Sequence, residues 1–463
     1  MTESTVNTPA NEVNTPWSTI GYLVYKRTYS RRLDEANPDS PTEEFRDTVE
    51  RVVRASNEQL GVGFSEEESQ RLRNYLLGLK GSVAGRFWWQ LGTRTVGQLG
   101  LASLQNCAFT TVNQPIRPFT WAMDMLMLGS GVGYNIQKKN IDKLPPVNEA
   151  FKMPTRVDSG DADYIVPDSR EGWVKLLGKT LKAAFLSNNA TTFTYSTQLI
   201  RGKGAPIKGF GGTASGPEDL CWGIEQISKV LEKRVGRKVR PIDALDIMNI
   251  IGAVVVAGNV RRSAQIAIGD ADDVEYLLAK RWDLGNIPSW RAMSNNSVVC
   301  SDMSDLHDYF WDGYEGKGEP YGLINLNLSR KVGRLGETQY PDPDVQGYNP
   351  CAEQSLADYE TCCLAEVFLP NVSSYEEFVD ITKLLYRINK HSLALPCHNK
   401  ETEAIVNKNM RMGIGVTGYL QATEEQREWL KEAYSELRLY DNEYSKLHNW
   451  NPSIKLTTVN LAA

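Results

Sequence analysis

Apolar residues recur every three or four positions along several parts of the chain, and this spacing predicts helices. The clearest examples are PTEEFRDTVERVVRASNEQL (41–60) and SEEESQRLRNYLLGLK (65–80), in which acidic residues precede the first apolar turn. Further helices are expected at FTWAMDMLML (119–128), from Asp168 onward in DSREGWVKLLGKTLKAAF, and at IDALDIMNIIGAVVVAG (242–258). Between these helices the apolar residues form shorter, β-rich runs.

Three of those runs predict strands: LASLQNCAFTTV (101–112), AQIAIGD (264–270) and MSNNSVVC (293–300). The glycines of GSGVGYN (129–135) are expected to end a helix before another short strand. Helices and strands alternate without an internal repeat, which is typical of an α/β protein. Several predicted strands have a polar or glycine-rich end, as expected where the active site of a barrel gathers at one mouth.

Composition narrows the class of protein. The 463 residues are 41% hydrophobic and 23% charged, and the formal net charge of −6 argues against a general attraction to nucleic acid or to an anionic membrane. The N-terminus lacks an apolar core of signal-peptide type, and no uncharged apolar run reaches the ~18 residues that span a bilayer. Seven cysteines, sparse and odd in number, argue against a secreted disulfide scaffold, so a cytoplasmic location is expected.

The segment NPCAEQSLADYETCCLAE (349–366) holds the strongest candidate chemistry. If it is extended, alternate side chains point the same way, and Asn349, Cys351 and Glu353 converge on one small volume. They would bring together an amide, a thiol and a carboxylate that can hold or release a proton. An ordinary loop with a buried cysteine stays open as an alternative. The adjacent thiols of Cys362 and Cys363 favour redox chemistry.

Metal binding and simple thiol exchange are less well supported. The nearest approach to a ligand cluster is His391, Cys397 and His398, but the spacing matches no known zinc site, so we expect no metal. Nothing resembles a CxxC motif at a helix N-terminus, which disfavours a thiol–disulfide oxidoreductase.

Two glycine-rich loops are candidate anion sites. In KGAPIKGFGG (203–212), glycines allow backbone amides to approach an anion, Lys203 and Lys208 supply positive charge, and a helix is expected near Ser215. The loop lacks the GKS or GKT ending of a P-loop, so ATPase chemistry is not indicated. The basic turn GNVRR (258–262) lies between a predicted helix and a strand, and a solvated turn is its alternative.

Taken together, these motifs resemble ribonucleotide reductase, the catalytic chain that converts ribonucleotides to deoxyribonucleotides. NPCAEQSLADYETC resembles the finger loop of that family. The neighbouring motifs resemble the monomeric, adenosylcobalamin-dependent branch that acts on ribonucleoside triphosphates. In chain order they include YKRTYSRRL (25–33), GRFWWQLGT (85–93), NCAFTTV (106–112), GSGVGYNI (129–136), KGAPIKGFGGTASGP (203–217), GNVRRSAQIAIGD (258–270), MGIGVTG (412–418) and SIKLTTV (453–459).

The resemblance implies roles for the cysteine segment. Cys351 would become a thiyl radical and abstract the 3′ hydrogen of the ribose. Glu353 would take the proton of the 3′-hydroxyl, and Asn349 would hydrogen-bond the sugar. Cys107 and Cys362 would lie on neighbouring strands, supply two electrons and become a disulfide. Cys363 would then point to the opposite face and be structural.

The resemblance also implies nucleotide sites in the loops. Residues 200–208 resemble a loop that contacts a deoxynucleoside triphosphate effector, and residues 257–262 resemble one that passes its signal to the substrate. The implied effector and specificity residues are Arg201, Lys203, Lys208, Asn259, Arg261 and Arg262. The implied substrate-binding residues are Asn106, Gly212, Ser215 and Gly216.

The implied fold is a ten-stranded α/β barrel with a central finger loop. Residues 1–16 would form a flexible lead, 17–100 an N-terminal helical region, and 101–463 the barrel with its effector loops. In the family, SIKLTTV continues into a phosphate-binding loop, further strands and a C-terminal cysteine pair, whereas this sequence stops at Ala463. We therefore expect the last barrel strands to be missing. A split enzyme with a complementing C-terminal fragment, a truncation and a minimal reductase all stay open.

Three hypotheses follow from the resemblance. The first is a reductase that takes its radical from adenosylcobalamin, which YKRTYSRRL and KGAPIKGFGGTASGP favour. The second keeps the reaction but takes the radical from a separate metal-containing subunit. The third is a non-enzymatic chain that binds a regulatory nucleotide and needs a complementing piece for turnover. A ribonucleotide substrate and a thioredoxin-like reductant are the implied partners of the enzyme.

Overall fold

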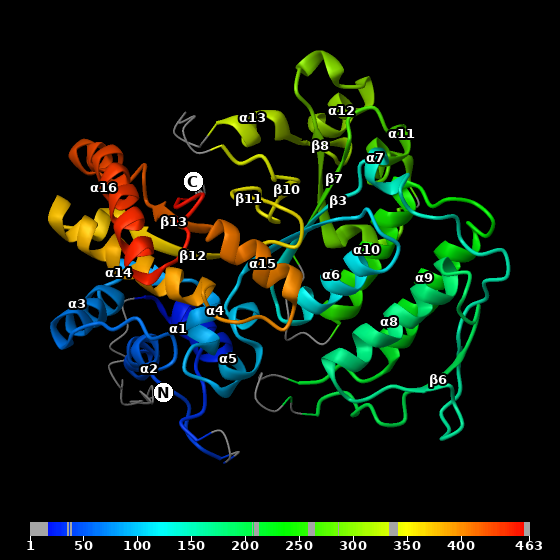
Figure 1. The fold of residues 1–463 in the computed structure, drawn as a ribbon, viewed down its shortest axis with the longest axis horizontal. Helices are drawn as coiled ribbons and strands as arrows, with labels where there is room; N and C mark the ends of the chain where they lie inside the picture. Colours follow the sequence, from blue (N-terminus) through cyan, green and yellow to red (C-terminus); the bar gives the residue numbers. More distant parts are fainter. Residues whose placement is uncertain are drawn as a thin grey trace, which may run out of the picture.

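A curved, eight-stranded sheet forms the centre of the molecule (Figure 1). The computed structural model describes residues 17–34, 37, 39–205, 207, 213–257, 264–285, 287–332 and 341–457. In spatial order the strands are β1 (Gly81–Val83), β12 (Thr361–Phe368), β2 (Cys107–Thr111), β3 (Gly131–Asn135), β7 (Gln265–Asp270), β8 (Ser294–Val299) and β9 (Gly322–Ile324), and β13 (Met412–Thr417) also pairs with β12.

The strands fall into two parallel sets. β2, β3, β7, β8 and β9 run parallel to one another, and β12 runs parallel to β13. The two sets meet where β12 pairs antiparallel with β2, and β1 pairs antiparallel with β12. The cysteines of the two sets meet at this junction, because Cys362 is the register partner of Cys107.

The sheet separates two apolar cores, because alternate side chains of a strand point to opposite faces. The larger core lies between the sheet and the helices packed outside it, chiefly α6 (Arg117–Met127), α10 (Pro241–Val256) and α14 (Tyr375–Leu393). The smaller core lies on the other face and includes Phe109 of β2 and Ile268 of β7. Helices outside and a separate core inside a curved, mostly parallel sheet confirm the predicted α/β barrel fold, to which the described residues contribute eight strands.

The expected elements are present. The two N-terminal amphipathic patterns form α2 (Phe45–Glu58) and α3 (Glu66–Leu77), and both begin with a capping box. The helix expected from Asp168 is α8 (Arg170–Phe185), and Ser169 caps it by accepting a hydrogen bond from the Gly172 amide. The strands predicted at 101–112, 129–135, 264–270 and 293–300 correspond to β2, β3, β7 and β8.

Smaller elements complete the structure. The remaining α-helices are α1 (Thr19–Thr28), α4 (Gly85–Gln90), α5 (Arg94–Leu99), α7 (Lys138–Ile141), α9 (Glu218–Glu232), α11 (Val274–Leu277), α12 (Asp308–Asp312), α13 (Leu326–Lys331), α15 (Lys400–Asn409) and α16 (Glu424–His448). A separate small sheet has the order β4 (Thr155–Arg156), β6 (Thr194–Ser196) and β5 (Tyr164–Ile165). It lies beside α8 and α9 at the lower right of Figure 1.

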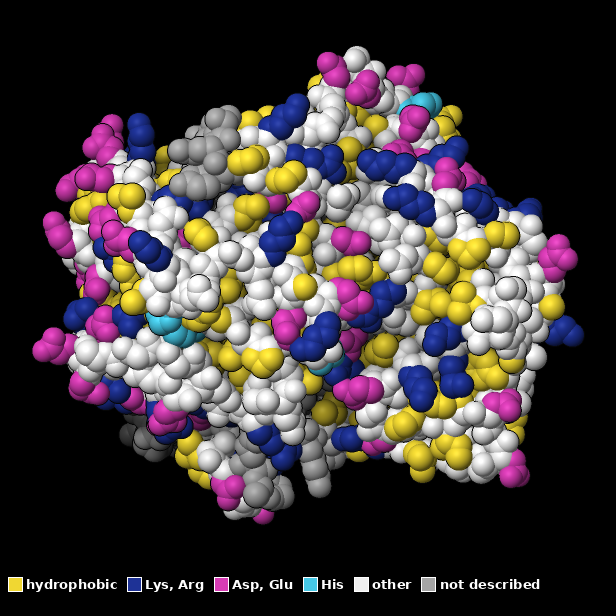
Figure 2. Space-filling view, viewed as in Figure 1, with side chains coloured by type: hydrophobic (Ala, Val, Ile, Leu, Met, Phe, Trp, Pro, Cys, Tyr) yellow, Lys and Arg dark blue, Asp and Glu magenta, His cyan; other side chains and the backbone are white. Residues whose placement is uncertain are grey.

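The surface in Figure 2 shows lysine and arginine side chains interspersed with acidic ones. This mixture matches the near balance of 51 basic and 57 acidic residues in the sequence. None of the helices in the described ranges has both the length and the apolar character that a membrane span requires.

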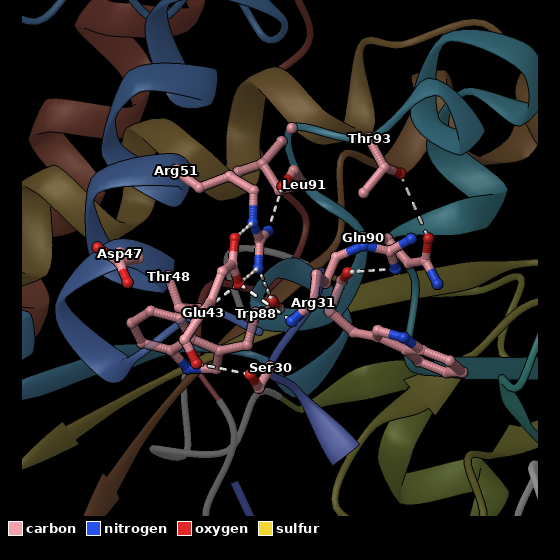
Figure 3. Close-up of polar contacts among 12 residues, drawn as sticks. Ser30, Arg31, Glu43, Asp47, Thr48, Arg51, Trp88, Gln90, Leu91 and Thr93 are labelled. Atoms are coloured by element: carbon pink, nitrogen blue, oxygen red, sulfur yellow. Dashed lines mark hydrogen bonds and ion pairs between the residues drawn. The ribbon is translucent and has the colours of Figure 1, made fainter. Parts of the chain in front are cut away.

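A buried ion pair holds the N-terminal helices together (Figure 3). Arg51 of α2 donates from Nε to Glu43 Oε1 at 2.6 Å and from Nη2 to Glu43 Oε2 at 2.9 Å. The same guanidinium donates to the carbonyls of Leu91 at 2.5 Å and Trp88 at 2.8 Å. One side chain thus joins the entrance of α2 to α4 and the residue that follows it. The predicted N-terminal helical region, 17–100, contains α1 to α5 and also β1, which belongs to the central sheet.

We expect Arg51→Ala to destabilise the protein by about 3–5 kcal/mol, because it leaves the Glu43 carboxylate buried without its partner. Denaturant unfolding followed by circular dichroism measures the change. Arg54→Ala on the same helix is the matched control, since the Arg54–Glu58 pair is solvent-exposed and 3.6 Å apart. Equal losses of stability in the two variants would contradict the assignment.

Candidate active site

A short hairpin lies against the inner face of the sheet. β10 (Gly347–Tyr348) and β11 (Ser355–Leu356) pair antiparallel, and β10 contacts β2 and β3. Figure 1 draws this hairpin in yellow between β12 and β13 on one side and β3, β7 and β8 on the other. The loop that closes it spans residues 349–354 and carries the candidate thiol, amide and carboxylate.

Two glycines of β3 make room for the hairpin. A β-carbon on Gly131 would lie 2.7 Å from Cγ of Pro350, and one on Gly133 would lie 1.9 Å from the Tyr348 carbonyl oxygen. Both glycines stand where the strand faces inward, since the intervening Val132 belongs to the outer core. The prediction that GSGVGYN ends a helix holds for Gly129, at φ +83° after α6. The other two glycines let a second backbone approach the strand.

The loop is a tight turn, so the prediction of an extended segment is wrong. The Ala352 amide donates to the Asn349 carbonyl at 2.9 Å, and Ala352 has a φ of +59°, in the left-handed region. The Gln354 amide donates to Asn349 Oδ1 at 2.9 Å. Asn349 and Glu353 nevertheless converge, because the turn brings the two ends of the loop together. Cys351 lies between them on the turn and is exposed.

The convergence forms a buried polar cluster. Asn349 Nδ2 donates to Glu353 Oε1 at 2.5 Å and to Cys107 Sγ at 3.0 Å. The Cys107 thiol in turn lies 4.0 Å from Glu353 Oε1. Glu353 Oε2 in this cluster, and Oδ1 of Asn106, the residue before Cys107 in the sequence, are buried acceptors without a hydrogen-bond partner. Because buried polar atoms are normally satisfied, these two oxygens indicate a place for donors from a bound molecule.

The second cysteine of the redox pair lies beside the first. Cys107 and Cys362 are both buried on the inner face of the sheet, where they are register partners. A hydrogen bond to Cys362, together with burial, raises the pKa of Cys107 well above its usual value. For Cys362 the hydrogen bond lowers the pKa, but burial and nearby acidic groups outweigh it and the net shift is upward. Both sulfurs are therefore held as thiols.

Cys363 lies on the other face of β12, as expected. Its sulfur belongs to the outer core and lies 3.7 Å from the Asn389 carbonyl oxygen. The exposed Cys351 differs from both neighbours in its surroundings. Partial desolvation, followed by the charges of Glu353 and Cys107, raises the pKa of Cys351 to about 11. An accessible sulfur that keeps its hydrogen at neutral pH is suited to hydrogen-atom transfer rather than to nucleophilic attack.

The predicted nucleotide loops are only partly described. Gly212, Lys208, Asn259, Arg261 and Arg262 lie outside the described residues. The base of the first loop is closed by two hydrogen bonds of 2.8 Å, from the Gly204 amide to the Ala214 carbonyl and from the Ala214 amide to the Ala205 carbonyl. The roles predicted for all of these loop residues stay predictions.

Four predicted loop residues are placed. Arg201 forms an ion pair with Asp168 at 2.6 Å, and Lys203 is exposed. Gly216 has a φ of +81° and lies against Lys203, so a β-carbon there would be 3.1 Å from the Lys203 nitrogen. Ser215 donates to the Gly216 carbonyl at 3.3 Å. The loop thus returns on itself next to Lys203, beside the N-terminus of α9.

The histidines that came nearest to a metal cluster in the sequence are engaged elsewhere. His391 contacts the Leu60 carbonyl at 3.0 Å and the Tyr444 hydroxyl at 2.8 Å. His398 contacts Asp124 at 2.6 Å, with Cys397 at 3.9 Å from its other ring nitrogen. Within the described part of the chain, no group of three or more His, Cys, Asp or Glu side chains could hold a metal ion.

Known families match two parts of the chain. Residues 1–93 match the family described as "Ribonucleotide reductase alpha domain". Residues 147–231 match "B12-dependent ribonucleotide reductase, insertion domain". The second match covers the small β4–β6–β5 sheet, α8 and nearly all of α9.

Whole-chain relatives agree with these matches. The chain is 32% identical to an adenosylcobalamin-dependent ribonucleoside-triphosphate reductase of Lactobacillus gasseri, over 97% of this chain and 72% of that protein. It is 34% identical to one from Lacticaseibacillus paracasei, over 88% and 62%, and 35% identical to one from Euglena gracilis, over 95% and 62%. The chain thus spans about two thirds of the length of these relatives.

The solved structures that the fold matches are also ribonucleotide reductases. The fold matches the crystal structure of a B12-dependent (class II) ribonucleotide reductase with a TM-score of 0.83 and 28% identity, over 96% of this chain and 73% of that one. A class Id ribonucleotide reductase alpha subunit from Actinobacillus ureae matches in fold alone, with a TM-score of 0.54 and 12% identity. The chain belongs to the adenosylcobalamin-dependent, class II family of ribonucleotide reductases.

Proposed function

We propose that this chain carries the catalytic site that reduces ribonucleoside triphosphates to 2′-deoxyribonucleotides. The observation that carries the proposal is the cluster of Asn349, Glu353 and Cys107 beside the exposed Cys351, with Cys362 next to Cys107. One hairpin and two adjoining strands bring these five proposed catalytic side chains together. The orphaned oxygens of Glu353 and Asn106 are where a ribose could donate.

The proposed reaction begins with Cys351 as a thiyl radical, which abstracts the 3′ hydrogen of the ribose. Glu353 accepts the proton of the 3′-hydroxyl as the 2′-hydroxyl leaves as water, and Asn349 holds the sugar. Cys107 and Cys362 together give two electrons and two protons and become a disulfide. Cys351 then returns its hydrogen to C3′, and Glu353 returns its proton to the 3′-oxygen. The balance is one ribonucleotide and two thiols consumed, and one deoxyribonucleotide, one water and one disulfide formed.

The cofactor proposed is adenosylcobalamin, which the names of the relatives specify. Cys351 fits this assignment, since its side chain is exposed and its raised pKa keeps the S–H bond that must be broken. When bound, the cofactor supplies the one-electron oxidation that turns this thiol into a radical. Cys351 is the residue of this chain that would face it.

Other parts of the proposal concern binding. Residues 200–208 and 257–262 are proposed to read a deoxynucleoside triphosphate effector, and Asn106, Gly212, Ser215 and Gly216 to contact substrate. Residues 200–208, 212, 215 and 216 lie inside the segment that matches the insertion domain of B12-dependent ribonucleotide reductases. A thioredoxin-like protein is the proposed reductant of the Cys107–Cys362 disulfide, and the cytoplasm is the proposed location.

An anaerobic turnover assay tests the function. The chain is incubated with adenosylcobalamin, dithiothreitol, each ribonucleoside triphosphate and a deoxynucleotide effector, and deoxynucleotides are quantified. Deoxynucleotide formation is the expected result. If a folded chain binds nucleotide but forms no product, a complementing C-terminal chain or a radical-generating subunit is added next. Failure under every combination would contradict the proposal.

The raised pKa of Cys351 predicts slow alkylation despite exposure. At pH 8 a thiol with a pKa of about 11 is about one part in a thousand thiolate, and the greater nucleophilicity of that thiolate offsets part of this, so iodoacetamide should modify it on the order of tenfold more slowly than an ordinary exposed cysteine. The rate should rise about tenfold per pH unit up to pH 10. Peptide mass spectrometry measures it at Cys351.

Glu353→Gln should raise the alkylation rate at pH 8, because removing the negative charge lowers the pKa of Cys351 while partial burial persists. Glu443→Gln, on the exposed face of α16, is the control and should leave the rate unchanged. A wild-type rate that levels off by pH 9 would show that Cys351 has an ordinary pKa.

A further inference from the structure

The hairpin that carries Cys351 is too short to hold itself in place. β10 and β11 contribute two residue pairs, Gly347 with Leu356 and Tyr348 with Ser355. An isolated two-stranded hairpin is marginally stable even when it is longer. The position of its turn must therefore be fixed by contacts outside the hairpin.

Residues 341–346, which lead into β10, and residues 357–360, which lead out of β11, are called the stems of the hairpin, and each stem carries a buried carboxylate. Asp342 lies five residues before β10 and is 1% exposed, and Glu360 lies four residues after β11 and is fully buried. Both carboxylates meet the guanidinium of one side chain, Arg411, which is also fully buried. Arg411 comes directly before β13, which pairs with β12 from Cys363 to Phe368.

The guanidinium of Arg411 forms hydrogen bonds with the carboxylates of both stems. Nη1 and Nη2 of Arg411 donate to the two oxygens of Asp342 at 2.6 and 3.0 Å. Its Nε donates to Glu360 Oε1 at 2.9 Å, and Nη1 also reaches Ser355 Oγ in β11 at 3.4 Å. A lysine is a single point charge and could not span both carboxylates in this way.

Neutral donors complete the network. Asn409 Nδ2 donates to Glu360 Oε1 at 2.9 Å, and the Ala357 amide donates to Glu360 Oε2 at 2.7 Å. On the other stem, the Asp342 amide donates to the Arg330 carbonyl at 2.9 Å. Removing Arg411 would leave two buried carboxylates without the guanidinium that joins them, which would loosen the contact between the stems.

We propose that Arg411 is a positioning residue that closes the base of the hairpin and thereby fixes Cys351 against Glu353 and Cys107. This inference rests on the proposed function for its catalytic meaning. The described hydrogen bonds of Arg411 go to residues that flank the turn, not to the turn that carries Asn349, Cys351 and Glu353. Its effect on the reaction is therefore carried by the two stems.

Arg411→Lys keeps the positive charge but loses the planar guanidinium that binds Asp342 and Glu360 together, so it tests whether that double contact holds the hairpin. With the stems unlocked, Cys351 should leave the neighbourhood of Glu353 and Cys107 and become an ordinary exposed thiol. Its alkylation rate by iodoacetamide at pH 8 should rise about tenfold or more. Formation of the Cys107–Cys362 disulfide by diamide should be largely retained, because Cys107 and Cys362 are register partners and the Glu360 carbonyl still accepts from the Phe109 amide of β2 through the backbone.

The control is Lys390→Met, which disrupts a different fully buried ion pair, the one between Lys390 and Asp441. Lys390 bonds Asp441 at 2.9 Å and Ser453 at 2.9 Å and does not contact the hairpin. We expect it to lower stability but to leave the Cys351 alkylation rate within twofold of wild type. A rise equal to that of Arg411→Lys would mean that disrupting any buried ion pair loosens the site, and would overturn the proposal.

A variant without the three charges covers the case in which Arg411→Lys does not fold. Asp342→Asn, Glu360→Gln and Arg411→Met together leave no uncompensated ion, a change that proteins often tolerate. A Cys351 alkylation rate within twofold of wild type, in whichever variant folds, overturns the proposal. Neither readout requires turnover, so its failure is distinct from failure of the proposed function.

Discussion

Replacing Cys351 with serine is expected to abolish deoxynucleotide formation, with a loss of at least about a thousandfold, and to leave nucleotide binding nearly intact. A hydroxyl cannot take the place of the thiol, because its O–H bond is far stronger than S–H and no oxygen radical would form. Since Cys351 is exposed on a turn, its loss removes little packing. The measurements are anaerobic turnover and, separately, effector and substrate binding by calorimetry.

Cys221→Ser is the control for this variant. Cys221 is partly exposed on α9, within the segment that matches the insertion domain, and has no part in the proposed chemistry. It should keep wild-type turnover. Retained turnover in Cys351→Ser would contradict the proposed thiyl-radical mechanism at Cys351, whatever the binding data showed.

The second large effect is expected at the redox pair. Cys107→Ser or Cys362→Ser should reduce the yield to at most one impaired or abortive cycle per chain, because one sulfur cannot supply two electrons. In the wild-type chain without added reductant, one deoxynucleotide per chain should form together with a disulfide joining residues 107 and 362. Quenched single-turnover assays and peptide mass spectrometry measure the two products.

The adjacent cysteine provides the matched control. Cys363→Ser changes a thiol one residue away from Cys362, but on the opposite face of β12. It should sustain multiple turnover in the presence of dithiothreitol. If Cys363→Ser failed and Cys362→Ser did not, the assignment of the redox pair would be wrong.

The sequence predicted the elements of the fold because their signals are local. The acidic first turn and apolar spacing that identify α2 and α3 lie within each segment, and so does the β-rich run of β2. The same holds for the set of reactive residues, since Asn349, Cys351 and Glu353 lie within five positions of one another. The turn geometry of these residues could not be predicted from the sequence. The residue with a left-handed φ is Ala352, whereas the usual sequence signal of that conformation is a glycine.

What the sequence could not predict depends on distant partners. Gly131 and Gly133 are needed because of Tyr348 and Pro350, more than two hundred residues later. The contact of Arg411 with Asp342 joins residues 69 positions apart, and nothing in the flanking sequence of either residue indicates it. A charged residue just before an apolar strand (RMGIGVT here) suggests a solvated entrance, whereas the side chain is fully buried.

The tandem cysteines of β12 have a consequence for folding errors. A strand that shifts by one residue against its neighbour exchanges its two faces, which normally places the wrong chemistry on each side. Here a one-residue shift against β2 would bring Cys363 opposite Cys107 in place of Cys362. The pair of sulfurs would survive a misalignment that displaced every other side chain of the strand. At this position of β12, therefore, either of the two registers presents a thiol to Cys107.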